Sequence, residues 1–91
     1  MKPRPFRTWC RHHAHRQTRI GPYRFFFVPL DYGEPPHIHV QRERMVAKFW
    51  LDPVALQKAG GFKAKELNQI AKLVQEYRDE FLEQWYEFFG R

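Results

Sequence analysis

The sequence predicts an α+β domain in which a three-stranded antiparallel sheet is followed by a short helix and a long C-terminal helix packed on one face. Two observations indicate this class. Between residues 18 and 51, apolar and polar side chains alternate with a period of two, which is typical of strands. After residue 63 the period becomes that of a helix, and one apolar stripe continues almost to the end of the chain.

Three segments are expected to form the strands. Residues 18–28 are rich in aromatic side chains, residues 37–41 follow two prolines, and residues 45–51 alternate regularly. Pro35 and Pro36 favour extended backbone where the second strand begins. The intervening residues 29–36 contain Asp, Gly and Pro, which are turn formers, so we expect an antiparallel hairpin.

Two helices are predicted after the strands. Asp52-Pro53 is typical of a helix N-cap followed by proline in the first turn, so a short helix is expected over residues 53–59, ending at Gly60-Gly61. A long helix is expected over residues 64–89, and its aromatic end would overhang the sheet as a surface for a partner. The apolar stripe of this helix consists of Leu67, Ile70, Val74, Tyr77, Phe81, Trp85 and Phe88.

Basic residues are concentrated at the start of this 91-residue chain, whose net charge is +6. Residues 1–17 show neither period, so the sequence predicts a basic, flexible arm followed by a single domain at 18–91. The arm is interpreted either as a contact for nucleic acid or as an extension produced by a start codon upstream of the true one. The cations that would contact nucleic acid there and at the first strand are Arg7, Arg11, Arg16 and Arg19.

Composition also limits the location and the ligands. Cys10 is the single cysteine, so no internal disulfide is expected and a reducing compartment is the default. No apolar run approaches the roughly 20 residues of a membrane span, so the cytoplasm is the expected location. The sequence contains no phosphate-binding loop and no dinucleotide fingerprint, so no cofactor is expected. A homodimer or a partner protein would add buried surface to this small core.

The two histidines after the double proline are the main candidates for a site. His37 and His39 lie two residues apart on a strand, so their side chains share one face at roughly 7 Å between Cα atoms. Ile38 and Val40 then point to the other face, toward the core. Whether the imidazoles are exposed depends on which face the long helix covers.

Three functions fit this pair, besides a purely structural one. The histidines would be the acid/base pair of a ribonuclease, with Lys48 or Arg24 stabilising charge on the phosphate. They would bind a metal ion, with a third ligand from Asp31, Glu34 or Glu43. The favoured hypothesis is a non-enzymatic surface for a partner protein and for RNA, formed by the two histidines with Arg24, Lys48 and Trp50.

Several segments occur together in a characteristic order. They are Ile20–Phe27, Glu34–Val40, Ala47–Pro53, Gly61-Phe62, Glu66-Leu67 and Glu83-Gln84-Trp85. With these segments, residues 18–90 resemble the small bacterial family of domain of unknown function 4160, and Pro-Pro-His-x-His is the most specific part. The first 17 residues depart from that family, whose members usually begin just before the first strand.

The resemblance implies a genetic context. Members of the family look like standalone genes that commonly lie beside a second small domain of unknown function, an arrangement similar to toxin–antitoxin pairs. The resemblance therefore implies a small partner protein encoded by an adjacent gene, whereas RNA is expected only from the aromatic and basic residues of the sheet. The ribonuclease toxin and the metal-binding domain are kept as alternatives.

Overall fold

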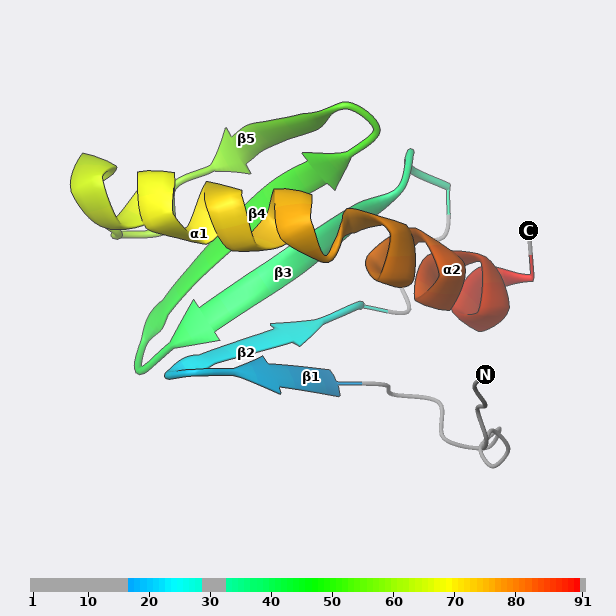
Figure 1. Ribbon diagram of the computed structural model, residues 1–91, viewed down its shortest axis with the longest axis horizontal. Coiled ribbons are helices and arrows are strands. Elements are labelled where there is room, and N and C mark those ends of the chain that lie inside the picture. Colours follow the sequence, from blue (N-terminus) through cyan, green and yellow to red (C-terminus); the bar gives the residue numbers. More distant parts are fainter. Residues whose placement is uncertain (1–16, 29–32, 91) are drawn as a thin grey trace.

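A computed structural model of the chain describes residues 17–28 and 33–90. The predicted arm, with Arg7, Arg11 and Arg16, lies outside these residues, as does Asp31, whereas Gln17 already belongs to the first strand. The α+β class is confirmed, but the sheet has five strands instead of the three predicted. The elements are β1 (Gln17–Ile20), β2 (Tyr23–Phe26), β3 (His37–Arg42), β4 (Met45–Leu51), β5 (Val54–Lys58), α1 (Ala64–Glu76) and α2 (Arg78–Phe89) (Figure 1).

The strands form an antiparallel meander in the order β1-β2-β3-β4-β5. The predicted first strand is in fact two strands, because Gly21-Pro22 forms the turn of a hairpin in which Ile20 lies opposite Tyr23. Gly21 has a φ of +58°, a conformation that glycine adopts without a steric penalty. The prediction of one strand over residues 18–28 therefore missed this hairpin.

The predicted short helix over residues 53–59 is wrong. This segment is the edge strand β5, which pairs with β4 so that Leu51 lies opposite Val54 and Phe49 opposite Leu56. Asp52-Pro53, whose peptide bond is cis, forms the turn between the two strands. Asp and Pro favour tight turns as well as helix starts, and here the unpaired edge of β4 provides hydrogen bonds that a helix would leave unused.

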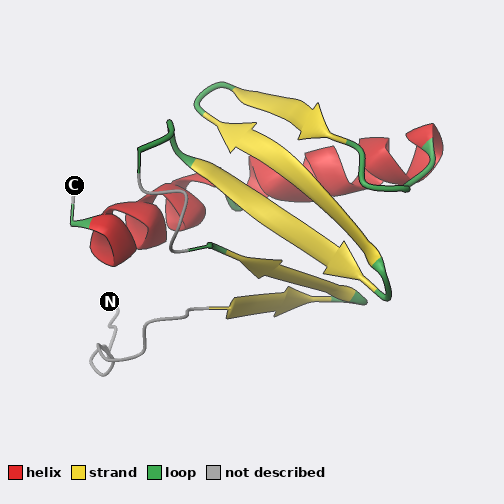
Figure 2. Ribbon diagram, turned by 180° about the vertical axis from the view of Figure 1, so that it is seen from behind, coloured by secondary structure: helices red, strands yellow, loops and turns green. Residues whose placement is uncertain are grey.

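The core lies between the sheet and the two helices. Figure 2 views the molecule from behind and shows both helices on the far side of the sheet. The predicted alternation is confirmed in β3 and β4, where Ile38 and Val40, and then Ala47, Phe49 and Leu51, are buried against the helices. The remaining buried hydrophobic residues are Tyr23, Phe25, Phe27, Phe62, Ile70, Val74, Phe81 and Trp85. The helices therefore cover the face opposite to His39.

The long helix predicted over residues 64–89 is two helices joined at Tyr77. The backbone bends there (φ −104°, ψ 13°), although the Tyr77 amide donates to the Leu73 carbonyl at 3.0 Å and the Phe81 amide to the Tyr77 carbonyl at 2.9 Å. Arg78, at the start of α2, donates to the Leu51 carbonyl at 2.8 Å. This bond attaches the bend to the end of β4, while the apolar stripe continues on the same side. None of the helices in the described ranges is long and apolar enough to cross a membrane.

Candidate nucleic-acid interface

Among the residues that the structure describes, both helices lie on one face of the sheet, and Arg19, Arg24, His39, Lys48 and Trp50 of the predicted binding residues lie on the other (Figure 2). The cross-strand pairs Arg24–Gln41, Phe26–His39 and His39–Lys48 point to this side, since the alternating residues of β2, β3 and β4 are buried under the helices. Arg19 lies opposite Arg24, and Lys58 lies opposite Lys48 at a register shift of the β4–β5 ladder. We call this the open sheet face and define it by Arg19, Arg24, Phe26, His39, Gln41, Lys48, Trp50 and Lys58.

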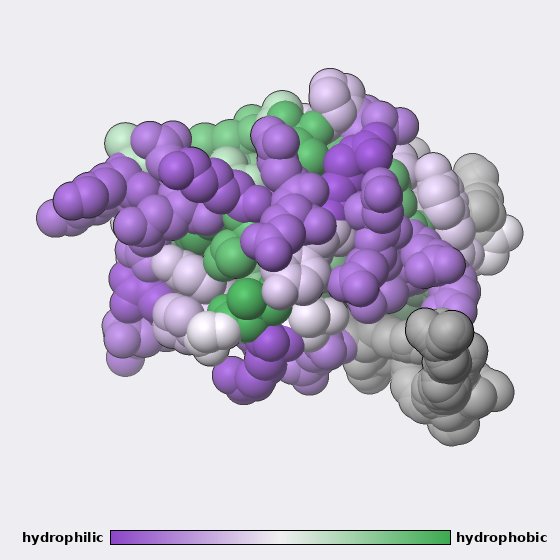
Figure 3. Space-filling view, viewed as in Figure 1, coloured by the Kyte–Doolittle hydropathy of each residue, from purple (hydrophilic) through white to green (hydrophobic). Residues whose placement is uncertain are grey.

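Charge is divided between the two layers of the molecule. The basic residues of the strands are Arg19, Arg24, Arg42, Lys48 and Lys58, and the strands contain no Asp or Glu. In α2, Arg78 accompanies Asp79, Glu80, Glu83 and Glu87. Figure 3 shows mainly hydrophilic side chains over the helices. The described part of the chain therefore combines a basic sheet with an acidic second helix.

Aromatic and basic side chains form a contiguous row on the open sheet face. The Arg24 guanidinium lies 4.2 Å from the centre of the Phe26 ring. The rings of Phe26 and His39 are stacked, with centroids 5.3 Å apart and planes inclined by 19°. Cations and flat rings in one row suit contacts with phosphates and bases.

Lys48 closes the row beside the loop before β3. Its Nζ lies 2.7 Å from Oε1 of Glu34 and 5.3 Å from the centre of the Trp50 ring. Glu34, which the sequence offered as a metal ligand, is thus the ion-pair partner of Lys48. Because this carboxylate is 44% exposed, water weakens the pair and Lys48 retains part of its attraction for anions.

His37 differs from His39 because it is completely buried. Its exposed fraction is 0%, and Nδ1 lies 2.9 Å from the Pro35 carbonyl and 3.6 Å from Oε1 of Glu34. The ring packs between two tryptophans, with centroid distances of 5.7 Å to Trp50 in β4 and 5.0 Å to Trp85 in α2. The first histidine of the pair therefore has the environment of a structural residue.

The positions of the two histidines bear on the ribonuclease hypothesis and on the metal-binding hypothesis. The rings of His37 and His39 are 5.3 Å apart, but only His39 has an exposed portion. An acid/base catalyst must reach the proton that it transfers, so the two imidazoles do not form an open catalytic pair in this structure. Within residues 17–28 and 33–90, no three His, Cys, Asp or Glu side chains are grouped so that they could hold a metal ion.

The family model with the description "Domain of unknown function (DUF4160)" matches residues 23–86. This range contains β2 to β5, α1 and nearly all of α2, and so most of the open sheet face. The chain belongs to this family. No curated protein and no solved structure matches it.

In this DUF4160 domain, sequence reasoning missed three residues of the open sheet face. Lys58 was placed on a helix, so its position beside Lys48 was hidden. Phe26 and Gln41 were assigned to strands without a role. The period-two alternation alone places both of them on the face of Arg24 and His39, and this signal was already present in the sequence.

A polar cluster ties the first turn of α1 to the sheet of the DUF4160 domain. Arg42 donates to Glu66 through Nε at 2.7 Å and through Nη2 at 2.9 Å, and the Tyr23 hydroxyl donates to the same carboxylate at 2.8 Å. These bonds, from Arg42 first and Tyr23 second, lower the pKa of Glu66. Burial, and then the bond to Glu66, raise the pKa of Tyr23.

The lowered pKa of Glu66 predicts a loss of stability in acid. Because the pKa of Glu66 is lower in the folded than in the unfolded chain, its contribution to stability is fully present above the pKa of the unfolded chain and is lost as the pH falls through the pKa of the folded chain. We expect thermal melts to show a higher melting temperature for wild type than for Glu66→Gln at pH 7. This difference in melting temperature should become smaller at pH 5 and again at pH 3. The control is Glu76→Gln, an exposed position on the same helix. An unchanged difference at pH 3 would contradict the prediction.

Proposed function

We propose that this chain binds single-stranded RNA through the open sheet face. The observation that carries the proposal is a helix-free sheet surface with cations and rings but without a carboxylate on its strands. Arg19, Arg24 and Lys58 would contact phosphates. The rings of His39 and Trp50 would stack on bases, an interaction that tolerates any base because every base has a flat face.

The distribution of charge supports the same ligand. Nucleic-acid affinity depends on the local arrangement of cations near the backbone, so a chain with little net charge beyond its first residues still attracts RNA on one side. The acidic α2 lies on the other layer and would repel a strand there. Binding is therefore expected at the sheet and not at the helices.

A matched pair of charge reversals tests the proposal. Lys58→Glu changes an exposed lysine on the open sheet face, and Lys72→Glu changes an exposed lysine on α1, so the two variants have equal net charge. We expect Lys58→Glu to weaken binding of a labelled single-stranded RNA and to lower the slope of log affinity against log salt by about 0.7, the value of one phosphate contact. Lys72→Glu is expected to bind as wild type does.

Fluorescence anisotropy of the full chain at several salt concentrations measures these affinities. Any contribution of residues 1–16 is common to both variants and cancels in the comparison. Equal weakening by both reversals, or no binding by the wild type at low salt, would contradict the proposal. Gel analysis of the same mixtures shows whether RNA is cut, and intact RNA is expected. A protein partner encoded by an adjacent gene, and a homodimer, stay predictions.

A further inference from the structure

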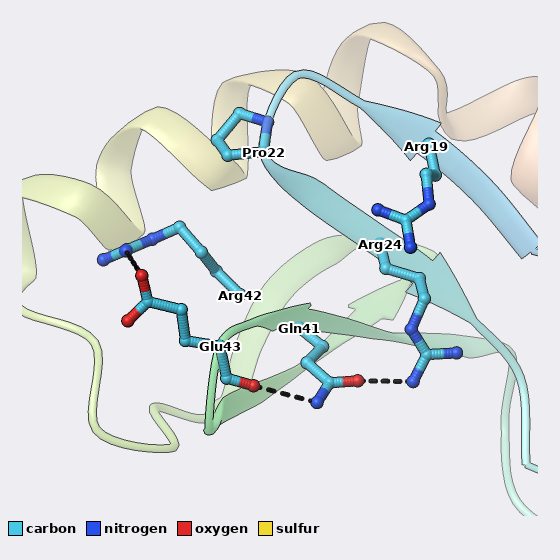
Figure 4. A pocket seen from close by; sticks show the side chains of 6 residues that line it. All are labelled: Arg19, Pro22, Arg24, Gln41, Arg42 and Glu43. Atoms are coloured by element: carbon cyan, nitrogen blue, oxygen red, sulfur yellow. Dashed lines mark hydrogen bonds and ion pairs between the residues drawn. The ribbon is translucent and has the colours of Figure 1, made fainter.

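A pocket of about 230 Å³ lies at the end of the open sheet face where the β1–β2 and β3–β4 turns meet (Figure 4). It is situated beside the pair Arg24–Gln41, which is the last pair of the β2–β3 ladder. The lining residues are Arg19, Pro22, Arg24, Gln41, Arg42 and Glu43. One water molecule takes up about 30 Å³ in the liquid, so a tetrahedral oxyanion fits the space.

The two arginines of β1 and β2 face each other without an acid between them. Arg19 and Arg24 are direct cross-strand partners, an arrangement of like charges that destabilises a sheet. Across the described ranges, Arg24 bonds only to amide oxygens, those of Gln17 at 3.3 Å and of Gln41, and Arg19 has no hydrogen bond or ion pair. Such a repulsive pair is consistent with a bound anion that compensates both charges.

The remaining charges of the pocket are already paired. Arg42 bonds to Glu66 through two nitrogens and lies 3.6 Å from the carboxylate of Glu43. Figure 4 shows that the Glu43 side chain points toward Arg42 and away from Arg24. The one carboxylate among the lining residues therefore lies on the Arg42 side of the pocket, and within the described ranges no carboxylate forms an ion pair with Arg19 or Arg24.

The Arg24 side chain is held in place before any ligand arrives. Its guanidinium lies over the Phe26 ring and bonds to Gln41, and Gln41 in turn donates to the Glu43 carbonyl at 2.9 Å. A guanidinium has five N–H donors, of which these contacts use two, so others remain for a ligand. A fixed, planar fork of donors suits a phosphate, which accepts two parallel bonds from arginine.

We propose that this pocket binds a phosphate group of the RNA backbone, with Arg19 and Arg24 as the residues that contact it. The inference rests on the proposed RNA-binding function and specifies where one phosphate is held. The position agrees with that function, because Arg24 begins the row that continues through Phe26 to His39. A strand with its phosphate in the pocket would therefore have its next bases over that row.

Arg19→Gln tests the proposal, because Arg19 is exposed and makes no described contact that folding needs. The matched control is Arg44→Gln, which removes an exposed arginine in the β3–β4 turn outside the pocket lining. We expect Arg19→Gln to lower the salt slope of single-stranded RNA binding by about 0.7 and Arg44→Gln to leave it unchanged. Titration of ¹⁵N-labelled wild type with inorganic phosphate, against sodium chloride at equal ionic strength, should shift the signals of Arg19, Arg24 and Gln41.

The outcomes separate this inference from the function on which it rests. RNA binding that is equally strong in both variants, with no response to phosphate, would overturn the pocket and leave the sheet-face proposal standing. A response to phosphate in a chain that binds no RNA would overturn the assignment to the RNA backbone and make free phosphate the ligand. Reduced slope for Arg19→Gln alone, with the phosphate response lost in that variant, supports the proposal.

Discussion

Replacing Gly60 by alanine is expected to prevent stable folding. A Cβ atom at this position would lie 1.8 Å from the Val46 carbonyl oxygen and 2.4 Å from its carbon, which are backbone atoms of β4. The residue also has a φ of +64°, which disfavours any side chain. Since β4 is a buried central strand that cannot move away cheaply, we expect a loss of more than about 4 kcal/mol in the free energy of unfolding.

Gly21→Ala is the matched control for this prediction. Gly21 has a similar φ of +58°, but a Cβ atom there would meet nothing within 4 Å. It therefore isolates the conformational cost, about 1–2 kcal/mol, from the collision with Val46. Urea denaturation followed by circular dichroism measures both variants. A loss for Gly60→Ala no larger than for Gly21→Ala would contradict the close contact between Gly60, in the turn after β5, and β4.

The two histidines are expected to respond in opposite ways to alanine. His37→Ala removes a fully buried ring from between Trp50 and Trp85 and loses its bond to the Pro35 carbonyl, so the free energy of unfolding should fall by about 2–4 kcal/mol. His39→Ala changes a half-buried side chain and should cost less than about 1 kcal/mol. Denaturation curves of the two variants measure this difference.

RNA affinity should show the reverse order. His39→Ala is expected to weaken binding roughly tenfold, since the stacking of one base on a ring contributes about 1–3 kcal/mol. His37→Ala, measured at a temperature where it is folded, should bind with nearly the wild-type affinity. Equal stability costs would contradict the distinct environments of the two rings. Equal losses of affinity would contradict the role assigned to His39.

The strands β3 and β4 could be predicted from the sequence because nothing in them interrupts the alternation. The errors fell at Gly21-Pro22 and Asp52-Pro53, two pairs that have more than one local use. Gly-Pro both delimits strands and turns hairpins, and Asp-Pro both begins helices and turns strands. Both pairs form the turns of local hairpins, β1–β2 and β4–β5, and the two residues alone do not distinguish this use from the other.

In the candidate site, too, one part could be predicted from the alternation and another part could not. Alternation predicted correctly that Ile38 and Val40 enter the core and that His39 lies opposite to them. It could not predict the burial of His37, because the ring is covered partly by Trp85, a residue of α2 that folding brings to the end of the sheet. The alternation along a strand indicates the face of the sheet to which a side chain points. Whether that side chain is buried depends on the residues that pack on this face.

Within the described residues, the separation of acidic α2 from the basic strands gives a dipole moment that crosses the sheet. Near any extended polyanion, the resulting torque would rotate a diffusing molecule until its sheet faces the polyanion. This rotation would occur before any side chain makes contact. Such orientation raises the fraction of productive encounters, and it fades at distances beyond about 8 Å at physiological ionic strength. The described residues can thus be oriented toward a polyanion without carrying a large overall charge.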